Sequence, residues 1–401
     1  MVMIALSSNF LLAAFISYVV STITFFVSAA GNRRKDRSPE DTRAIRWGWI
    51  GFWIAAIGFL FQTAFIFTRW YAGGHFPTSN MFEFMAFLAY SIIVAFLVIF
   101  LVYRVSVLGI FAMPIGVIML AYASVFPREI APLIPALKSY WLQIHVTVAA
   151  LGEGAFAVGF AAGLMYLVRT VNQKENKRDA KWLEAVLCMM LMLIGFIIAT
   201  TTFSSLGYQA QFKMTVDGAP SQVVYEMPAI AGPQNGELLT EGKMQPWFEA
   251  PGWMQGVNAA RKLNTIIWSM ASGLVLYGLI RLVFRKRLGE IFAPMVRDLD
   301  PDTIDEISYR AIAIGFPIFT LGALVFAMIW AAEAWGRFWG WDPKEVWALI
   351  TWLFYSAYLH LRLSRGWQGR KSAWMSVIGF IVVMITLVFV NLVIVGLHSY
   401  A

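Results

Sequence analysis

Charged residues are scarce in this chain, and their scarcity excludes an ordinary soluble domain. Only 13% of the 401 residues are Asp, Glu, Lys or Arg, whereas a soluble domain carries about a quarter. The hydrophobic fraction is 59%, and many apolar runs reach the ~20 residues that a helix needs to cross a bilayer. The sequence therefore predicts an all-α fold, a polytopic transmembrane helical bundle in which residues 1–401 form a single membrane domain.

Cysteine is almost absent, which limits the covalent and metal chemistry that the chain can supply. The one cysteine, Cys188, lies inside an apolar run. The chain therefore has neither an internal disulfide nor a cysteine-based metal cluster. The net charge of +8 is explained by the excess of Lys and Arg in cytoplasmic loops of membrane proteins, so it predicts membrane lipid and no nucleic acid as a partner.

The apolar runs predict ten membrane spans. They are residues 9–30, 47–68, 81–103, 107–125, 141–168, 183–203, 264–284, 309–333, 345–363 and 372–396. No basic stretch precedes the first span, and the cluster Arg33-Arg34-Lys35 follows it, which indicates an uncleaved span with its N-terminus outside. In that orientation the predicted inner segments hold 22 of the 31 basic residues, and both termini lie outside.

Two polar segments interrupt the apolar pattern. Residues 204–263 form an extracytoplasmic insert loop, in which Gln222–Glu226 (QVVYE) predicts a short strand and Trp253–Asn264 an amphipathic helix on the membrane. The insert is either a solvated loop or a docking surface for an outer partner. Residues 285–308 form a cytoplasmic linker, in which Asp302-Thr303 opens a short helix.

A third segment, YAGGHFPTSNMFE at residues 71–83, is predicted at the outer surface. Its glycines and Pro77 break the preceding helix, and Ser79 or Asn80 can cap the next span. Glu83 then falls in the first turn of a membrane helix, where the helix dipole favours a carboxylate.

The most unusual stretch is WGRFWGWDPKEVWALITW, which runs from Trp335 to Trp352 and contains five tryptophans. We call residues 335–345 the tryptophan-rich segment. Indoles supply large apolar faces, and the glycines between them permit close approach of the backbone. An interfacial aromatic belt explains tryptophans alone, but it does not require the adjoining Asp342-Pro343-Lys344-Glu345. Asp342 is either an N-cap before Pro343 or a group that assists proton transfer.

The predicted topology places three of the four histidines at one membrane level. His75, His145 and His398 lie at the outer level, where the tryptophan-rich segment also lies. His360 follows Lys344 by 16 residues in one helix, which places it about 24 Å deeper. Two imidazoles from separate helices beside indoles suit haem, whose iron takes two axial ligands. A zinc site at His145 and His398, a quinone site and helix–helix hydrogen bonds are the alternatives.

Several motifs resemble one known family. WGRFWGWDPKEVWALITW is similar to the WWD motif of the haem-handling proteins of cytochrome c biogenesis. The longer run from Gly315 to the end, with its C-terminal VNLVIVGLHSYA, is similar to the CcsA (ResC) branch. SYWLQIHVTVAALGEGAFAVGF and FPTSNMFEFMAF also resemble family segments, whereas residues 204–263 do not. The D-P-K-E-V-W continuation and GLHSYA favour this branch over the CcmC and CcmF types.

The resemblance implies a cytochrome c haem lyase of the bacterial inner (plasma) membrane, with its active face on the periplasmic side. It implies that haem b, the substrate, crosses the membrane and is attached outside to the CxxCH motif of apocytochrome c. His145 and His398 correspond to the outer axial ligands and act with Asp342 as the catalytic residues, while His360 corresponds to an intramembrane ligand.

The same resemblance extends the haem contacts to the tryptophan-rich segment. The contact residues that it implies are Trp335, Gly336, Trp339, Trp341 and Asp342. It also implies a partner subunit of the CcsB (ResB) type, because the chain has no second histidine at the level of His360. The main alternative functions are a haem exporter without ligation activity and a CcmC/CcmF-type haem-handling protein. A membrane scaffold without haem is a further alternative.

Overall fold

The computed structural model describes residues 2–390, except 32–41, 125, 127, 131–132, 134–137, 176, 217–218 and 253–258. The first seven helices are α1 (Val2–Gly31), α2 (Thr42–Gly73), α3 (Met81–Tyr103), α4 (Ser106–Ala123), α5 (Tyr140–Thr170), α6 (Arg178–Ser205) and α7 (Ala259–Phe284). They are followed by α8 (Leu288–Val296), α9 (Pro301–Phe319), the π-helix η2 (Thr320–Phe326), α10 (Ala327–Trp335), α11 (Pro343–Arg365), α12 (Arg370–Met384) and the π-helix η3 (Ile385–Val390).

The all-α, multi-pass prediction is confirmed. Within the described residues, nine helical segments are long and apolar enough to cross a membrane. They correspond to nine of the ten predicted spans. The tenth, at residues 345–363, is also a helix, α11, but it is not among the nine. This helix has 23 residues, and its Trp, Tyr, His and charged residues lower its hydropathy.

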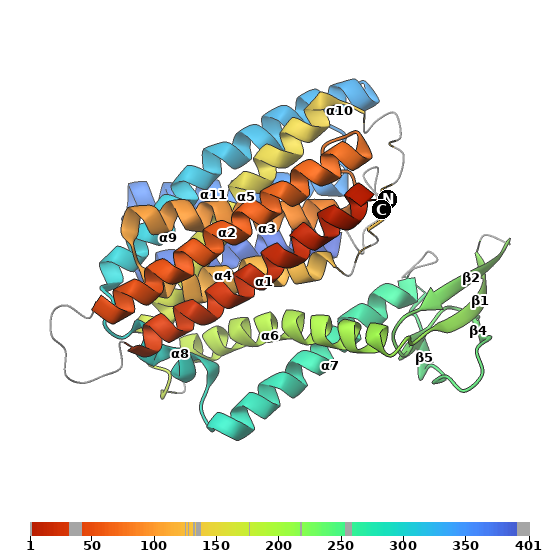
Figure 1. Ribbon diagram of the computed structural model, residues 1–401, viewed down its shortest axis with the longest axis horizontal. Helices are drawn as coiled ribbons and strands as arrows, with labels where there is room; N and C mark the ends of the chain where they lie inside the picture. Colours follow the sequence, from red (N-terminus) through yellow and green to blue (C-terminus); the bar gives the residue numbers. More distant parts are fainter. Residues whose placement is uncertain are drawn as a thin grey trace. The chain divides into compact units, whose positions relative to one another are not determined.

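The chain divides into two compact units, 1–172 with 292–401, and 173–291. In the first unit α5 is the central helix and packs against α3, α9, α12 and η2. Figure 1 shows α1 and α2 side by side in the same unit, and the two helices pack together along their length. The C-terminal two thirds of α5 are rich in Gly and Ala and largely buried, because small side chains let neighbouring helices approach closely in a membrane.

A buried polar network joins α9, α11 and α12. The Arg362 guanidinium donates to Asp305 Oδ1 at 3.0 Å and to Ser372 Oγ at 2.9 Å. The hydroxyl groups of Tyr358 and Ser372 also share a hydrogen bond at 3.0 Å. Polar and charged side chains are tolerated inside a membrane protein when they form hydrogen bonds with one another. This network therefore stabilises the packing of the three helices.

In the second unit, residues 204–263 form more secondary structure than the sequence predicted. The strand predicted at Gln222–Glu226 is largely contained in β2 (Ala219–Tyr225), which is antiparallel to β1 (Ala210–Val216). β1 also pairs with β4 (Glu237–Leu238), while β3 (Ala231–Gly232) and β5 (Phe248–Glu249) form a second, parallel pair. Half of the amphipathic helix predicted at Trp253–Asn264 falls on residues 253–258, outside the described part, and the other half coincides with the start of α7, at Ala259.

The three-stranded sheet has a small apolar core of its own. Phe212 and Met214 of β1 and Val223 and Tyr225 of β2 are buried on one face, with the period of two expected for a strand. Burial raises the pKa of Tyr225 to about 12. Apolar and polar residues alternate over only a few positions in each strand, so the sequence predicted one strand and not the hairpin.

The helix that leads into the tryptophan-rich segment contains a π-helical stretch, η2. It follows α9 directly and continues into α10. η2 packs against α5, and a Cβ atom built on Gly322 falls 2.2 Å from the backbone nitrogen of Ala149. Only glycine therefore fits here, and the close approach brings α10 beside the helix that carries His145.

Replacing Gly322 with valine is expected to separate η2 from α5, because the clash is with backbone that has no rotamer to adjust. The free energy of unfolding should fall by about 1–3 kcal/mol. The thermal unfolding midpoint of the purified protein in detergent measures this. The matched control is Gly278→Val, since a Cβ atom at Gly278 meets nothing within 4 Å; equal losses for both variants contradict the prediction.

Candidate functional site

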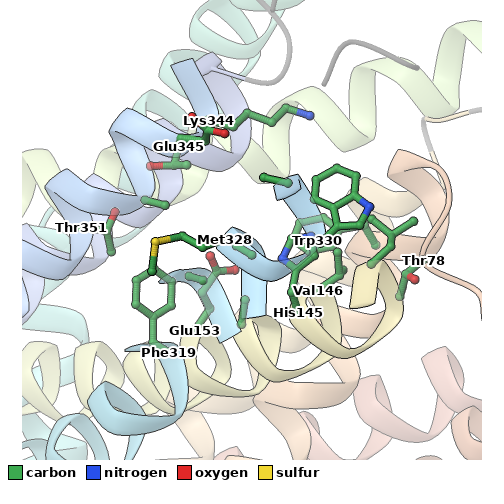
Figure 2. A pocket seen from close by; sticks show the side chains of 18 of the residues that line it. Thr78, His145, Val146, Glu153, Phe319, Met328, Trp330, Lys344, Glu345 and Thr351 are labelled. Atoms are coloured by element: carbon green, nitrogen blue, oxygen red, sulfur yellow. The ribbon is translucent and has the colours of Figure 1, made fainter. Parts of the chain in front are cut away.

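A large pocket lies in the first unit, between α5, α10, α11 and the segment that precedes α3. It contains about 1320 Å³ of empty space, including the part that opens to the exterior. Its walls are mainly apolar and aromatic, and Figure 2 shows side chains from these helices around an open centre. The polar or ionisable lining residues are Thr78, Ser79, Asn80, His145, Glu153, Lys344, Glu345, Thr351 and Thr386. This lining suits a ligand that is mainly apolar and polar only at a few points.

His145 lines the pocket from the first half of α5. Its ring stacks on the indole of Trp330, with centroids 5.1 Å apart and planes 17° apart. Trp330 is 2% exposed and contacts Trp335 edge to face at 4.7 Å. The imidazole is half-buried, so one face is fixed by an aromatic neighbour while the ring remains at the pocket wall.

A polar contact holds the start of α5 against the end of α10. The Ser139 hydroxyl donates to Glu333 Oε2 at 2.9 Å. The same hydroxyl oxygen accepts from the backbone nitrogen of Trp141 at 3.1 Å and so caps the helix. Because Glu333 is two residues before Trp335, this contact places the tryptophan-rich segment beside His145.

The tryptophan-rich segment forms a tight loop between α10 and α11. Gly336 ends α10 in the left-handed conformation, at φ +68°, where glycine is favoured. Trp341 also has a positive φ, of 56°, which is costly for a residue with a side chain. The Glu345 carboxylate accepts from the backbone nitrogens on both sides of Trp341, those of Gly340 at 2.7 Å and Asp342 at 3.2 Å. Glu345 therefore holds the strained loop in place.

Asp342 begins α11 as its N-cap. Its carboxylate accepts from the backbone nitrogen of Lys344 at 3.0 Å, and with Glu345 it completes a capping box. Asp342 is 5% exposed. The geometry thus accounts for Asp342 as the structural start of the helix, one of the two roles that the sequence left open.

The part of the pocket wall formed by residues 78–80 is anchored by a buried ion pair. The Arg69 guanidinium donates to Glu83 Oε1 at 2.7 Å, and the two side chains are 3% and 1% exposed. The other Glu83 oxygen accepts from the nitrogen and the hydroxyl of Ser79 at 2.9 and 2.8 Å. Asn80 is the N-cap of α3, as predicted. Thr78, Ser79 and Asn80 are thereby held at the pocket.

The structure brings together only some of the residues that the sequence singled out. His145, Trp335 and Trp339 line the pocket. Gly336, Trp341 and Asp342 belong to the same loop but do not line it, and Trp341 is 71% exposed.

His75 and His360 are not among the residues that line the pocket. His360 is exposed on α11, where Ser364 Oγ lies 3.4 Å from its Nδ1. His75 is near the backbone oxygen of Phe76 and does not line the pocket. His398 lies outside the described residues. Among those residues, no cluster of three or more His, Cys, Asp or Glu is arranged to hold a metal ion.

The sequence interpretation missed several residues of this site. Glu153 is 8% exposed and lines the pocket from the middle of α5. An acidic residue inside a membrane span is a signal of function, and this signal was present in LGEGAF. Trp330 and Phe319 gave no comparable signal, because an aromatic residue within an apolar helix is ordinary.

Comparison with known proteins places the chain in a family. The family model described as "Cytochrome C assembly protein" matches residues 78–205 and 265–398. The chain belongs to this family. The two matched ranges include the pocket-lining segments and leave out most of residues 204–263, the insert that showed no resemblance in the sequence.

Curated relatives match the chain over nearly its full length. A protein of Nostoc punctiforme is 32% identical over 90% of this chain and 93% of its own length. A protein of Gloeobacter violaceus is 30% identical, over 97% and 94%, and one of Microcystis aeruginosa is 33% identical, over 86% and 85%. Each is named cytochrome c biogenesis protein CcsA. The family predicted from the motifs is therefore confirmed.

Proposed function

We propose that this chain is a subunit of a cytochrome c haem lyase, which moves haem b across the bacterial plasma membrane and presents it for attachment to apocytochrome c. One observation carries the proposal: His145 lines a large apolar pocket together with Trp335 and Trp339 of the tryptophan-rich segment. A flat iron porphyrin packs against apolar walls and takes axial ligands such as imidazole, which supports a porphyrin as the occupant of this pocket. The three relatives named above carry names of cytochrome c biogenesis proteins.

In this proposal His145 and His398 hold the haem iron from two sides at the extracytoplasmic face. Each cysteine thiol of the CxxCH motif adds across one haem vinyl group: sulfur bonds to one vinyl carbon and the thiol proton goes to the other. The addition needs no external oxidant or reductant. Because the nucleophiles come from apocytochrome c, the contribution of this chain is proximity and orientation, with Glu345 holding the loop that lies against the pocket.

His360 supports a second, intramembrane position for haem that is shared with a CcsB-type subunit. Its side chain is exposed on the surface of α11 and does not line the pocket. A histidine inside a membrane span is costly unless it finds a partner. An exposed imidazole at this depth is therefore available to a group on another chain.

The test is covalent haem attachment in cells that express this chain with a CcsB-type subunit and a c-type cytochrome. We expect the cytochrome to keep haem after denaturing electrophoresis, and a substrate with AxxAH in place of CxxCH to lose it. A haem exporter without ligation activity is the alternative. It predicts haem on the outer side of the membrane and no increase of covalently bound haem above that of cells lacking the chain.

A further inference from the structure

Glu153 is a carboxyl group buried in the middle of a membrane-spanning helix. It is 8% exposed, and its Oε2 atom is shielded from solvent and has no hydrogen-bond partner within the described residues. Burying such a group without a partner costs free energy. A partner that arrives with a ligand offsets that cost, so Glu153 is a candidate for a binding contact.

The position of Glu153 relative to His145 limits what it can contact. The two residues are eight positions apart on α5 and both line the pocket, which places them about 12 Å apart along the helix axis. Figure 2 shows the carboxyl group of Glu153 turned towards the open centre of the pocket. The carboxyl group therefore faces the pocket that would hold the porphyrin, about two turns along α5 from the proposed iron ligand.

Two other polar residues that line the pocket, Glu345 and Thr351, have hydrogen-bond partners within the described residues. The Glu345 carboxylate accepts from two backbone nitrogens, and the Thr351 hydroxyl donates to the backbone oxygen of Trp347 at 2.9 Å. Glu153 therefore differs from Glu345, the other carboxyl among the lining residues, in having an oxygen available to a ligand.

The charge of the ligand indicates what this carboxyl does. A porphyrin ring bound to a metal is a dianion, so its core carries one positive charge with Fe(III) and none with Zn(II). We propose that Glu153 is a ligand-binding residue whose carboxylate compensates the positive core of a ferric porphyrin in this pocket. The inference rests on the proposed function, because it requires that the pocket takes a metalloporphyrin.

The expected effect is a preference for the charged porphyrin core. When Glu153 is ionised, a carboxylate and a positive core separated by about the 12 Å rise between the two residues attract, at an effective dielectric constant of about 20, by an amount that corresponds to roughly a tenfold change in affinity. The preference comes from charge, so it should disappear when the carboxyl is replaced by an amide of the same shape.

The experiment compares Fe(III) protoporphyrin IX with Zn(II) protoporphyrin IX on the purified full-length protein and on Glu153→Gln. Soret absorbance and zinc porphyrin fluorescence measure the two affinities. We expect Glu153→Gln to lose about tenfold in Fe(III) porphyrin affinity and to bind the Zn(II) porphyrin as the unmodified protein does. Glu306→Gln makes the same chemical change at a partly exposed residue outside the pocket, paired with Arg310, and should change neither affinity.

The outcomes separate this inference from the proposed function. Equal loss of both porphyrins shows that Glu153 acts through shape or hydrogen bonding, and overturns the inference, as does no loss of either. If the unmodified protein binds neither porphyrin, the proposed function fails as well. Should Glu153→Gln not fold, Glu153→Asp keeps the charge and is expected to retain the preference for Fe(III); a loss of that preference contradicts the proposal.

Discussion

Purified protein in which His145 is replaced by glycine is expected to lose most of the Soret absorption of bound haem, and added imidazole should restore it. His145 lines the pocket, and its ring stacks on the buried indole of Trp330. Glycine removes the axial ligand and leaves a space of the size of free imidazole beside that indole. The absorption spectrum, recorded with and without imidazole, measures the effect.

His75→Gly is the matched control for this experiment. His75 precedes α3 and does not line the pocket, so the variant should keep the Soret band of the unmodified protein. An unchanged spectrum in His145→Gly contradicts the assignment of His145 as an axial ligand. His398→Gly should behave as His145→Gly does, a prediction that comes from the family resemblance alone.

The second large effect is expected at the ion pair between Arg69 and Glu83. Replacing Arg69 by methionine leaves the Glu83 carboxylate, which is 1% exposed, without its counter-charge. Removing one partner of a buried pair costs about 3–5 kcal/mol of unfolding free energy. Because Glu83 also binds Ser79, the part of the pocket wall formed by residues 78–80 should loosen. The thermal midpoint in detergent and the haem retained after gel filtration measure the two consequences.

A double variant separates the uncompensated charge from lost packing. Arg69→Met with Glu83→Gln removes both charges, and it should be less destabilised than Arg69→Met alone. The partly exposed pair of Glu306 and Arg310 provides a reference, since breaking it with Arg310→Met should cost at most about 1 kcal/mol. If Arg69→Met costs no more than Arg310→Met, the buried pair does not anchor this wall.

The membrane helices were predictable because almost every one is an apolar run long enough to cross a bilayer. The main exception in hydropathy is α11, where Trp, Tyr and Arg replace aliphatic residues. The caps were also local: Asn80 before α3 and Asp342 before α11 lie next to the residues they bond. Local contacts of this kind can be read from neighbouring positions in a sequence.

The sheet in residues 210–249 was underestimated for the opposite reason. A strand is stabilised by residues across the sheet, such as Phe212 opposite Val223 and Leu238. A strand of two residues has no periodicity to detect, so β3, β4 and β5 left no pattern in the sequence.

By itself, the sequence determined the membrane class, the family and the chemical types at the site, because hydropathy and the motif around Trp335–Trp352 are local properties. Only the tertiary structure decided which of these residues share one pocket. It placed His145, Trp335 and Trp339 together with Glu153 in the pocket. It left the side chain of Trp341 exposed in the loop before α11, and that of His360 exposed on α11. The physical reason is helix packing: the close approach of η2 to α5 at Gly322 depends on the fit of two surfaces, which neither segment specifies alone.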